Sequence, residues 1–174
     1  RPQTTRRIIR GILTTPDAQL ILVDTPGLHR PRTLLGERLN DQVRETWATV
    51  DAIGLCLPAD ELIGPGDRFI ASQIIELGNK PIVVIVTKAD KVNRETLAER
   101  LLDVQLLGEQ LGVSWASIIP VSANNGENIE SLIAEFTKLL PAGPDLYIDG
   151  EVTDEPLEIM IAELIREAAL EGVE

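Results

Sequence analysis

The sequence predicts an α/β fold with a largely parallel sheet, and three apolar runs carry this prediction. Residues 20–23, 81–86 and 118–121 are continuous apolar segments of the length expected for strands buried on both faces. Segments with apolar residues at helical spacing alternate with them, which is typical of α/β proteins. Each run ends in a short polar loop, and such sheets bind ligands at the carboxyl ends of their strands. We therefore expect the three loops to line one edge of the sheet.

The first half of the chain begins with an exposed polar loop at residues 1–7, which show no periodicity. A turn-rich connector at 14–18 separates two strand-like segments and indicates an antiparallel pair. Apolar residues at every fourth position predict a helix over 35–50 with a core stripe of Leu35, Leu39, Val43 and Trp47. The other expected elements of this half are strands at 7–13, 19–23 and 52–57, a loop at 58–66 and a helix at 67–77.

The second half contains three expected helices, and each has an apolar stripe that we interpret as core packing. Asn93 is expected to cap the first of them, because its side chain can accept a hydrogen bond from an amide of the first turn. An acidic, turn-rich linker at 145–156 precedes the last helix, which is too short to be stable without a surface to pack on. The expected helices are 93–111, 128–140 and 157–170.

Composition and charge limit the classes of function. A chain of 174 residues with 44% apolar residues can form one domain with a substantial core. Its formal net charge of −12 argues against this segment gripping nucleic acid by itself. No apolar run approaches the ~20 residues needed to span a bilayer, and we expect a cytoplasmic protein. The one cysteine, Cys56, is interpreted as a buried core residue in a reducing compartment.

The three loops carry groups that suit a guanine nucleotide. The first reads DTPG, where the Asp24 carboxylate suits water-mediated contact with Mg²⁺ and the Gly27 N–H suits contact with a terminal phosphate. The second reads TKAD, and Asp90 can accept two hydrogen bonds from adjacent N–H donors, which guanine offers and adenine does not. The third reads SAN, at residues 122–124, where a backbone N–H can donate to the guanine O6.

The order and spacing of these motifs resemble the GTP-binding core of Ras-like GTPases. Together with PQTTR at residues 2–6, the LH after DTPG and a tail that reads DEPLEIMIAELIREAAL, they resemble bacterial GTPases of the Era family over nearly the whole chain. The resemblance implies a three-layer domain with a mixed, mostly parallel sheet. It also implies GTP and GDP as ligands, Mg²⁺ as the metal ion, and GTP hydrolysis by in-line attack of water.

The same resemblance implies a role for each motif residue. Thr5, in preference to Thr4, would ligate Mg²⁺, Asp24 would hold the ion through water, and Gly27 would sense the terminal phosphate, and these three form the expected catalytic set. Lys88 would pack along the base, Asp90 would fix the guanine, and Ser122 with Ala123 would close the pocket. The expected nucleotide-binding residues are Asp24, Thr25, Pro26, Gly27, Thr87, Lys88, Asp90, Ser122, Ala123 and Asn124.

Three positions qualify these roles. Leu28 is apolar where many small GTPases have a glutamine that orients the attacking water, so activation of water needs another group, a monovalent cation or a partner. His29, the only histidine, is interpreted as a solvated residue because nothing is expected to fix its tautomer. Thr87 replaces the asparagine usual in the NKxD motif, and its hydroxyl keeps some hydrogen-bonding capacity.

Two parts of such a GTPase are missing from the sequence. No two glycines are five residues apart, which excludes a GxxxxGK phosphate loop, and none are three apart, which excludes the GXXG of a KH domain. In the family, the strand before the phosphate loop lies between the strands expected at 19–23 and 52–57, so their facing edges are expected to lack a partner. The chain also begins without Met, and we interpret it as a piece of something longer. We expect residues 1–142 to be a partial GTPase domain and 143–174 a linker and first helix leading to a C-terminal KH domain.

The resemblance further implies a GTPase that acts in assembly of the small ribosomal subunit by binding small-subunit ribosomal RNA through its KH domain, and this is the working hypothesis. A peripheral membrane contact and the oligomeric state are left open. One alternative is a nucleotide-free interaction module that docks a partner through its last helix, which the missing phosphate loop favours. Another is a different GTPase of the same superfamily, such as one acting in transfer RNA modification, against which the terminal segment argues.

Overall fold

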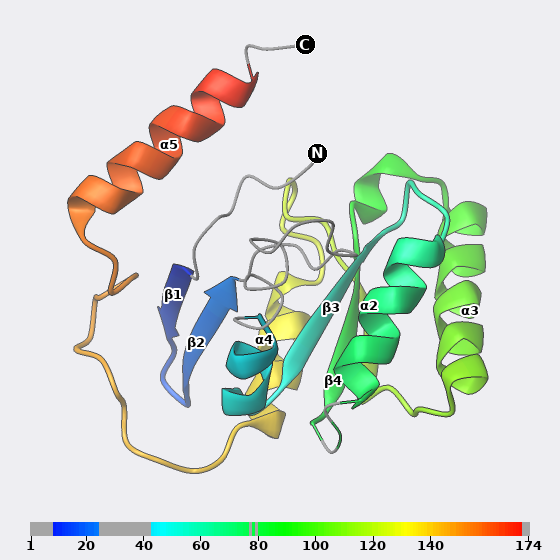
Figure 1. The fold of residues 1–174 in the computed structure, drawn as a ribbon, viewed down its shortest axis with the longest axis horizontal. Coiled ribbons are helices and arrows are strands. Elements are labelled where there is room, and N and C mark those ends of the chain that lie inside the picture. Colours follow the sequence, from blue (N-terminus) through cyan, green and yellow to red (C-terminus); the bar gives the residue numbers. More distant parts are fainter. Residues whose placement is uncertain (1–8, 25–42, 77, 79, 172–174) are drawn as a thin grey trace. The chain divides into compact units, whose positions relative to one another are not determined.

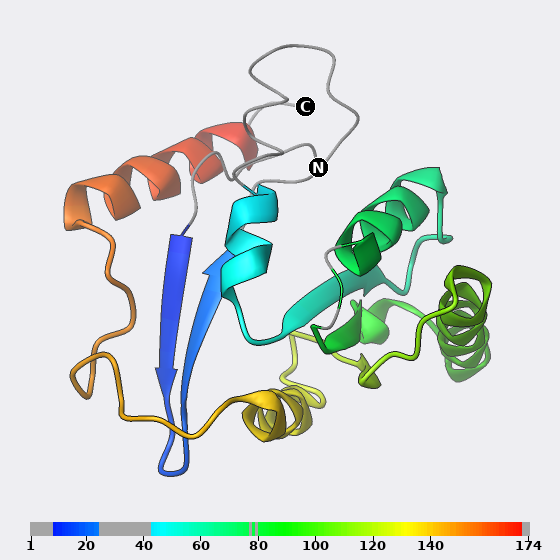
Figure 2. The same cartoon turned by 60° about the horizontal axis from the view of Figure 1, so that its bottom comes forward.

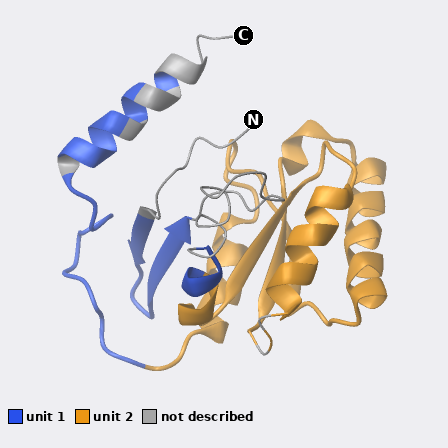
Figure 3. Cartoon of the chain, viewed as in Figure 1, with its two compact units in different colours: residues 1–46, 143–174 blue, residues 47–142 orange. Residues whose placement is uncertain are grey.

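The structure is a computed structural model that describes residues 9–24, 43–76, 78 and 80–171. These residues belong to two compact units (Figure 1, Figure 3). The first unit comprises Arg1–Thr46 and Gly143–Glu174, and the second comprises Trp47–Ala142. The loop predicted at 1–7 lies outside the described residues.

The first unit is built on a hairpin of β1 (Ile9–Thr14) and β2 (Gln19–Asp24), which pair antiparallel as predicted. Thr14 lies opposite Gln19 at the turn, and Ile9 lies opposite Asp24 at the open end. Thr15 closes the turn because its N–H and hydroxyl both donate to the carbonyl of Ala18, at 2.8 and 2.9 Å. The hairpin therefore delivers Asp24 at the end of a regular strand.

Residues 146–154, which we call the strap, run beside β1 (Figure 2). The N–H of Ile12 donates to the carbonyl of Val152 at 2.9 Å, and the Thr153 hydroxyl donates to the carbonyl of Arg10 at 2.7 Å. An ion pair of 2.9 Å joins Arg10 to Asp154. The predicted linker is thus hydrogen-bonded to a strand more than a hundred residues earlier in the chain.

Gln19 fixes the other end of the strap. Its Oε1 accepts hydrogen bonds from the backbone N–H groups of Leu146 and Tyr147, each at 2.9 Å, and its Nε2 donates to the Tyr147 carbonyl at 3.1 Å. One amide side chain therefore satisfies three backbone groups of an otherwise irregular segment. The strap leads into α5 (Leu157–Glu171), which confirms the predicted last helix.

The second unit contains a parallel sheet in the order β3-β4-β5, which confirms the predicted α/β class. The strands are β3 (Ile53–Pro58), β4 (Ile82–Thr87) and β5 (Ser117–Pro120). The helix α4 (Ile129–Leu139) covers one face, and α2 (Pro65–Glu76) and α3 (Arg94–Leu111) lie on the other (Figure 1, Figure 2). The central strand β4 is buried from Ile82 to Val86, as expected for a strand covered on both faces.

The core under α4 is formed by alternate residues of β4 and by residues at and just after β5. Its buried members are Val83, Ile85, Ile119 and Val121, and the helix packs Ile129, Leu132, Phe136 and Leu139 against them. These apolar contacts position the carboxyl ends of β4 and β5, where the polar loops begin.

Cys56 is exposed, and the prediction that it is a buried core residue is wrong. It lies on β3, an edge strand of the three-stranded sheet. Ile53, Leu55 and Leu57 of this strand are buried, whereas Gly54 and Cys56, which alternate with them, are exposed. A Cβ added to Gly54 would lie 3.2 Å from Phe136 Cζ, so α4 reaches β3 at Gly54. Cys56 is two residues further along the same face. The apolar residues on either side of Cys56 in the sequence were therefore a misleading indication that Cys56 is buried.

The helix ends follow local chemistry. Asn93 caps α3 as predicted, since its side chain accepts a hydrogen bond of 2.8 Å from the Thr96 N–H. α2 begins at Pro65, two residues before the predicted start, because proline is suited to the first helical turn. Residues 43–49 are helical, with Val43 and Trp47 buried as the stripe predicted, while Leu35 and Leu39 fall outside the described residues. None of the described helices is both long and apolar enough to cross a bilayer.

Candidate functional site

The loop after β4 carries the TKAD motif in a tight turn. Lys88 has a left-handed backbone, with φ 57° and ψ 34°, which is unfavourable for a residue with a side chain. A short 3₁₀ helix, Ala89–Lys91, follows it. The turn is anchored at Ala89, which is buried and whose N–H donates to the Val121 carbonyl at 3.1 Å. Asp90 is left exposed immediately after this anchor.

The loop after β5 carries the SAN motif and is closed on itself. Ser122 is fully buried, its N–H donates to the carbonyl of Glu127 at 3.2 Å, and its carbonyl accepts from the Gly126 N–H at 2.9 Å. Gly126 has φ +78°, a conformation that glycine adopts without strain. Ser122 thus shapes the loop from inside, while Ala123 and Asn124 are exposed on its outer surface.

The two loops meet at the same end of the sheet. The Ala89–Val121 hydrogen bond joins them directly, and the Val121 N–H donates to the carbonyl of Val86 in β4 at 2.8 Å. Among the described residues, no hydrogen bond or ion pair engages the Asp90 carboxylate. This edge therefore presents the exposed Asp90 carboxylate, a hydrogen-bond acceptor, next to the exposed loop of Ala123 and Asn124, whose backbone can supply a donor.

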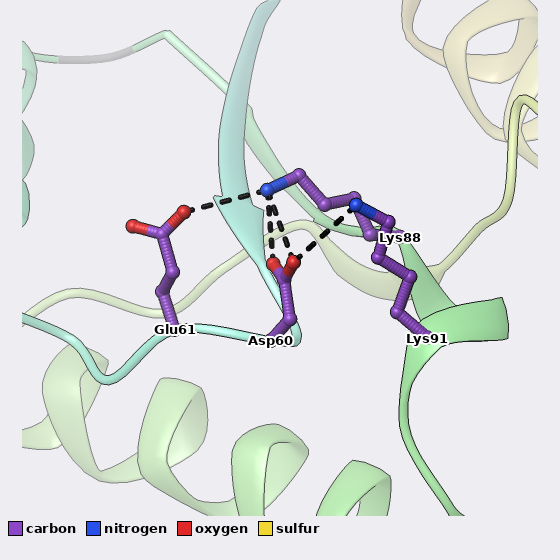
Figure 4. Close-up of polar contacts among 4 residues, drawn as sticks. All are labelled: Asp60, Glu61, Lys88 and Lys91. Atoms are coloured by element: carbon purple, nitrogen blue, oxygen red, sulfur yellow. Dashed lines mark hydrogen bonds and ion pairs between the residues drawn. The ribbon is translucent and has the colours of Figure 1, made fainter. Parts of the chain in front are cut away.

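A third loop, which follows β3, joins this edge. Ala59 is fully buried and its N–H donates to the carbonyl of Thr87 at 2.8 Å. The Lys88 Nζ lies 3.0 and 3.2 Å from the two carboxylate oxygens of Asp60 and 3.3 Å from Glu61 Oε1 (Figure 4). The Nζ of Lys91 lies 3.7 Å from Asp60 Oδ2.

Sequence reasoning missed Asp60 and Glu61, because it treated residues 58–66 only as a connecting loop. A usable signal was present: the two carboxylates come directly after the end of a parallel strand, where the other two motifs also lie.

The pKa values of the paired groups move in opposite directions. The hydrogen bond from Lys88 lowers the pKa of Asp60, and the hydrogen bond to Asp60 raises the pKa of Lys88. Because the pKa of Asp60 is lowered in the fold, its ion pair stabilises the protein at pH values above the ordinary carboxyl pKa. This stabilisation is lost as the pH falls through the lowered pKa. Because the pKa of Lys88 is raised in the fold, its ion pair stabilises the protein at pH values below the ordinary amine pKa. This stabilisation is lost as the pH rises through the raised pKa. Both groups are therefore charged at neutral pH.

The first motif is described only at Asp24, which is exposed at the end of β2 in the first unit. Thr5, Thr25, Pro26 and Gly27 lie outside the described residues, as do Leu28 and His29. Within the described part of the chain, no group of three or more His, Cys, Asp or Glu side chains is arranged to hold a metal ion. Mg²⁺ at a nucleotide site is typically bound by one or two protein ligands together with phosphates, and the donor set of Thr5 and Asp24 fits that type of site.

Comparison with known proteins identifies the family. The family model described as "50S ribosome-binding GTPase" matches residues 1–88, which is half of the chain. The chain belongs to this GTPase family. GTPase Era of Streptomyces coelicolor is 61% identical over 173 residues, an alignment that covers 99% of this chain and 55% of that protein. The resemblance to Era is thereby confirmed. The chain spans about half the length of the curated relatives it matches.

Two solved structures of this family have the same fold. A crystal structure of Era in complex with MgGDPNP and nucleotides 1506–1542 of 16S ribosomal RNA is 30% identical, with a TM-score of 0.85 over 96% of this chain and 55% of that chain. A variant of Aquifex aeolicus Era bound to GDP·AlF4⁻ is 29% identical, with a TM-score of 0.83 over 97% of this chain and 56% of that chain. The expected Ras-like GTPase fold is confirmed.

Proposed function

We propose that the protein carrying this chain binds GTP and GDP with Mg²⁺ and hydrolyses GTP. The observation that carries the proposal is the exposed Asp90 carboxylate, which has no hydrogen bond or ion pair among the described residues and lies beside the exposed Ala123–Asn124 loop. Guanine presents two adjacent N–H donors and a carbonyl acceptor to such an edge, whereas adenine presents its amine where guanine has its carbonyl. The proposal is supported by the similarity to Era structures that hold MgGDPNP and GDP·AlF4⁻.

In this proposal, each motif residue has a role in binding the nucleotide or the metal ion. Asp90 accepts the two guanine N–H groups, the backbone of Ala123 or Asn124 donates to O6, and buried Ser122 keeps that loop in shape. The Lys88 methylenes pack along the base, and Thr87 ends the strand that positions them. At the phosphate end, Thr5 and Asp24 hold the metal ion, and the DTPG backbone at Thr25, Pro26 and Gly27 contacts the terminal phosphate. Bound Mg²⁺ supplies charge neutralisation to the phosphates.

We also propose that this activity serves small-subunit ribosomal RNA. The description of the matching family refers to the 50S ribosomal subunit, whereas the solved structure of Era contains a segment of 16S ribosomal RNA. We give more weight to Era, because the similarity to Era extends over nearly the whole chain. The acidic chain is a poor RNA ligand by itself, so we assign RNA contact to a KH domain following residues 143–174 and nucleotide binding to residues 1–142. A cytoplasmic location fits this role.

The test uses the full-length protein that carries this sequence. A fluorescent GDP analogue is titrated in the presence of Mg²⁺ and then displaced by GTP, GDP or ATP, and phosphate release from GTP is followed separately. We expect saturable binding that GTP and GDP displace and ATP does not, together with slow phosphate release. Asp103→Asn, a change of a carboxylate on α3 away from the loops, should leave binding unchanged. Absence of saturable binding would favour the nucleotide-free interaction module.

A further inference from the structure

The Lys88 side chain is held at both of its ends. Its backbone is fixed in a left-handed turn between Thr87 and the buried Ala89, and its Nζ is bound by two carboxylates on a different loop. The side chain therefore spans from the carboxyl end of β4 to the loop after β3 (Figure 4). A free lysine has many rotamers, so this extended position is imposed by its partners.

Asp60 is the main partner. It receives Nζ on both oxygens, at 3.0 and 3.2 Å, and 27% of its side-chain surface is exposed, compared with 67% for Glu61. The position of Asp60 is itself restricted by its surroundings. The preceding residue, Ala59, is buried and its N–H donates to the Thr87 carbonyl, and Lys91 Nζ lies 3.7 Å from Asp60 Oδ2. The carboxylate is thus fixed relative to the same strand end from which Lys88 departs.

An extended lysine has a functional consequence at this edge. Its methylenes form an apolar strip that a flat base can cover, while the amine stays in a charged environment. Ordering a free lysine on binding reduces affinity, and an interaction that orders it beforehand removes that cost. The residue that holds Nζ therefore influences binding of the base without touching it.

We propose that Asp60 is a positioning residue that holds Lys88 extended and so increases affinity for guanine nucleotides. The inference rests on the proposed function, because it concerns the base-binding role of Lys88. Glu61 assists as a second, more exposed partner of the same amine. The Lys91 amine pairs with Asp60 at the longer distance of 3.7 Å and contributes to its orientation.

The test is a double-mutant cycle on the full-length protein, measured as Kd for the fluorescent GDP analogue in Mg²⁺. Asp60→Ala is expected to raise Kd by about 3- to 10-fold, the range expected for ordering one long side chain. In a Lys88→Met background, which keeps the length and removes the amine, Asp60→Ala is expected to change Kd by less than about 1.5-fold. Asp60→Glu, which retains the charge, should recover part of the loss.

The control and the outcomes separate the two proposals. Asp103→Asn removes the carboxylate of another ion pair in the same unit, with Arg100, and should leave Kd unchanged. If the wild type fails to bind GDP, the proposed function fails. If the wild type binds and Asp60→Ala has no effect, tightens binding, or weakens it equally in the Lys88→Met background, the positioning role is overturned while the proposed function stands.

Discussion

At the scale of single residues, Gly108 shows how closely α3 is packed. A Cβ at this position would lie 2.6 Å from Trp115 Nε1 and 3.0 Å from the Val113 carbonyl, while the same indole nitrogen donates to the Val104 carbonyl at 2.8 Å. Gly108→Ala gains about 1 kcal/mol of helix propensity, but the clash displaces the indole and costs more. We expect a net destabilisation of about 1–3 kcal/mol, measured as a lower urea midpoint of unfolding.

Gly66 in α2 provides the matched control. Among the described residues, nothing outside its chain neighbours and its own helix backbone lies within 4 Å of a Cβ added there, and its backbone is not in the left-handed region. Gly66→Ala should be neutral or stabilise by up to about 1 kcal/mol, because it only restricts the unfolded chain. Equal effects of the two alanine substitutions would contradict the packing argument.

Asp90 and Asp60 show what sequence could and could not predict about the site. Asp90 was predicted because its motif follows an apolar strand directly, and the structure leaves it exposed at the expected edge. The pairing of Asp60 with Lys88 was not predicted, because the two residues are 28 positions apart and the pairing depends on how two loops meet. The same applies to Gln19 and Tyr147, which are 128 positions apart.

At the scale of elements, the strap contains a pH-dependent contact. The Tyr147 hydroxyl donates to Asp154 Oδ2 at 2.9 Å, and this hydrogen bond raises the pKa of Tyr147 above its ordinary 10.0. The contribution to stability is present below pH 10 and is lost as pH rises through the shifted pKa, because the phenolate cannot donate and is repelled by the carboxylate. Asp154→Ala removes the largest cause of the upward shift and should move the pKa of Tyr147 back toward its ordinary value.

The measurement is an absorbance titration of phenolate formation, with the Tyr147→Phe spectrum subtracted so that only Tyr147 contributes. Glu151→Ala, a change of a nearby exposed carboxylate that does not receive the hydroxyl hydrogen bond, should leave most of the upward pKa shift in place. An unchanged Tyr147 titration in Asp154→Ala would show that the strap contact does not persist in solution.

The start of α3 gives a second prediction for an element. Asn93 Oδ1 accepts a hydrogen bond of 2.8 Å from the Thr96 N–H, one of the amides that has no partner within the helix. Asn93→Ala should therefore destabilise the protein by about 1 kcal/mol, and Asn93→Asp, which keeps an acceptor, should not. Both are measured by the urea midpoint, and equal loss in the two variants would contradict the capping role.

Helix starts were predictable from the apolar stripes, but the capping role of a side chain was predictable at one of two asparagines. Asn93 was expected to cap and does so through a side-chain bond to the residue three positions later. Asn128, expected near the start of α4, has a left-handed backbone with φ 58° and makes no side-chain capping bond, and its Nδ2 donates to the Pro120 carbonyl at 2.9 Å. Identical side chains thus take different roles, and only tertiary contacts decide between them.

At the scale of the whole molecule, the class and the order of elements followed from apolar periodicity. In the described part of the chain, the strands and helices lie where the sequence predicts them, within about two residues at most ends, because apolar runs and helical stripes are strong local signals. The burial of residues on the edge strand could not be predicted in this way, and Cys56 is the example. Whether such a residue is buried depends on how far α4 extends over β3. Local pattern therefore determines the elements, and packing determines which faces are covered.

In the proposed function, the edge formed by the TKAD and SAN loops binds guanine through Asp90. The most direct measurement compares the affinities of the full-length wild type and Asp90→Asn for GDP and for xanthosine diphosphate. An asparagine offers one donor and one acceptor, which matches the N–H and carbonyl of xanthine and not the two N–H groups of guanine. We predict that GDP affinity falls by at least about 100-fold, while affinity for xanthosine diphosphate rises. Unchanged GDP binding in Asp90→Asn would contradict the assignment of this edge as the guanine site.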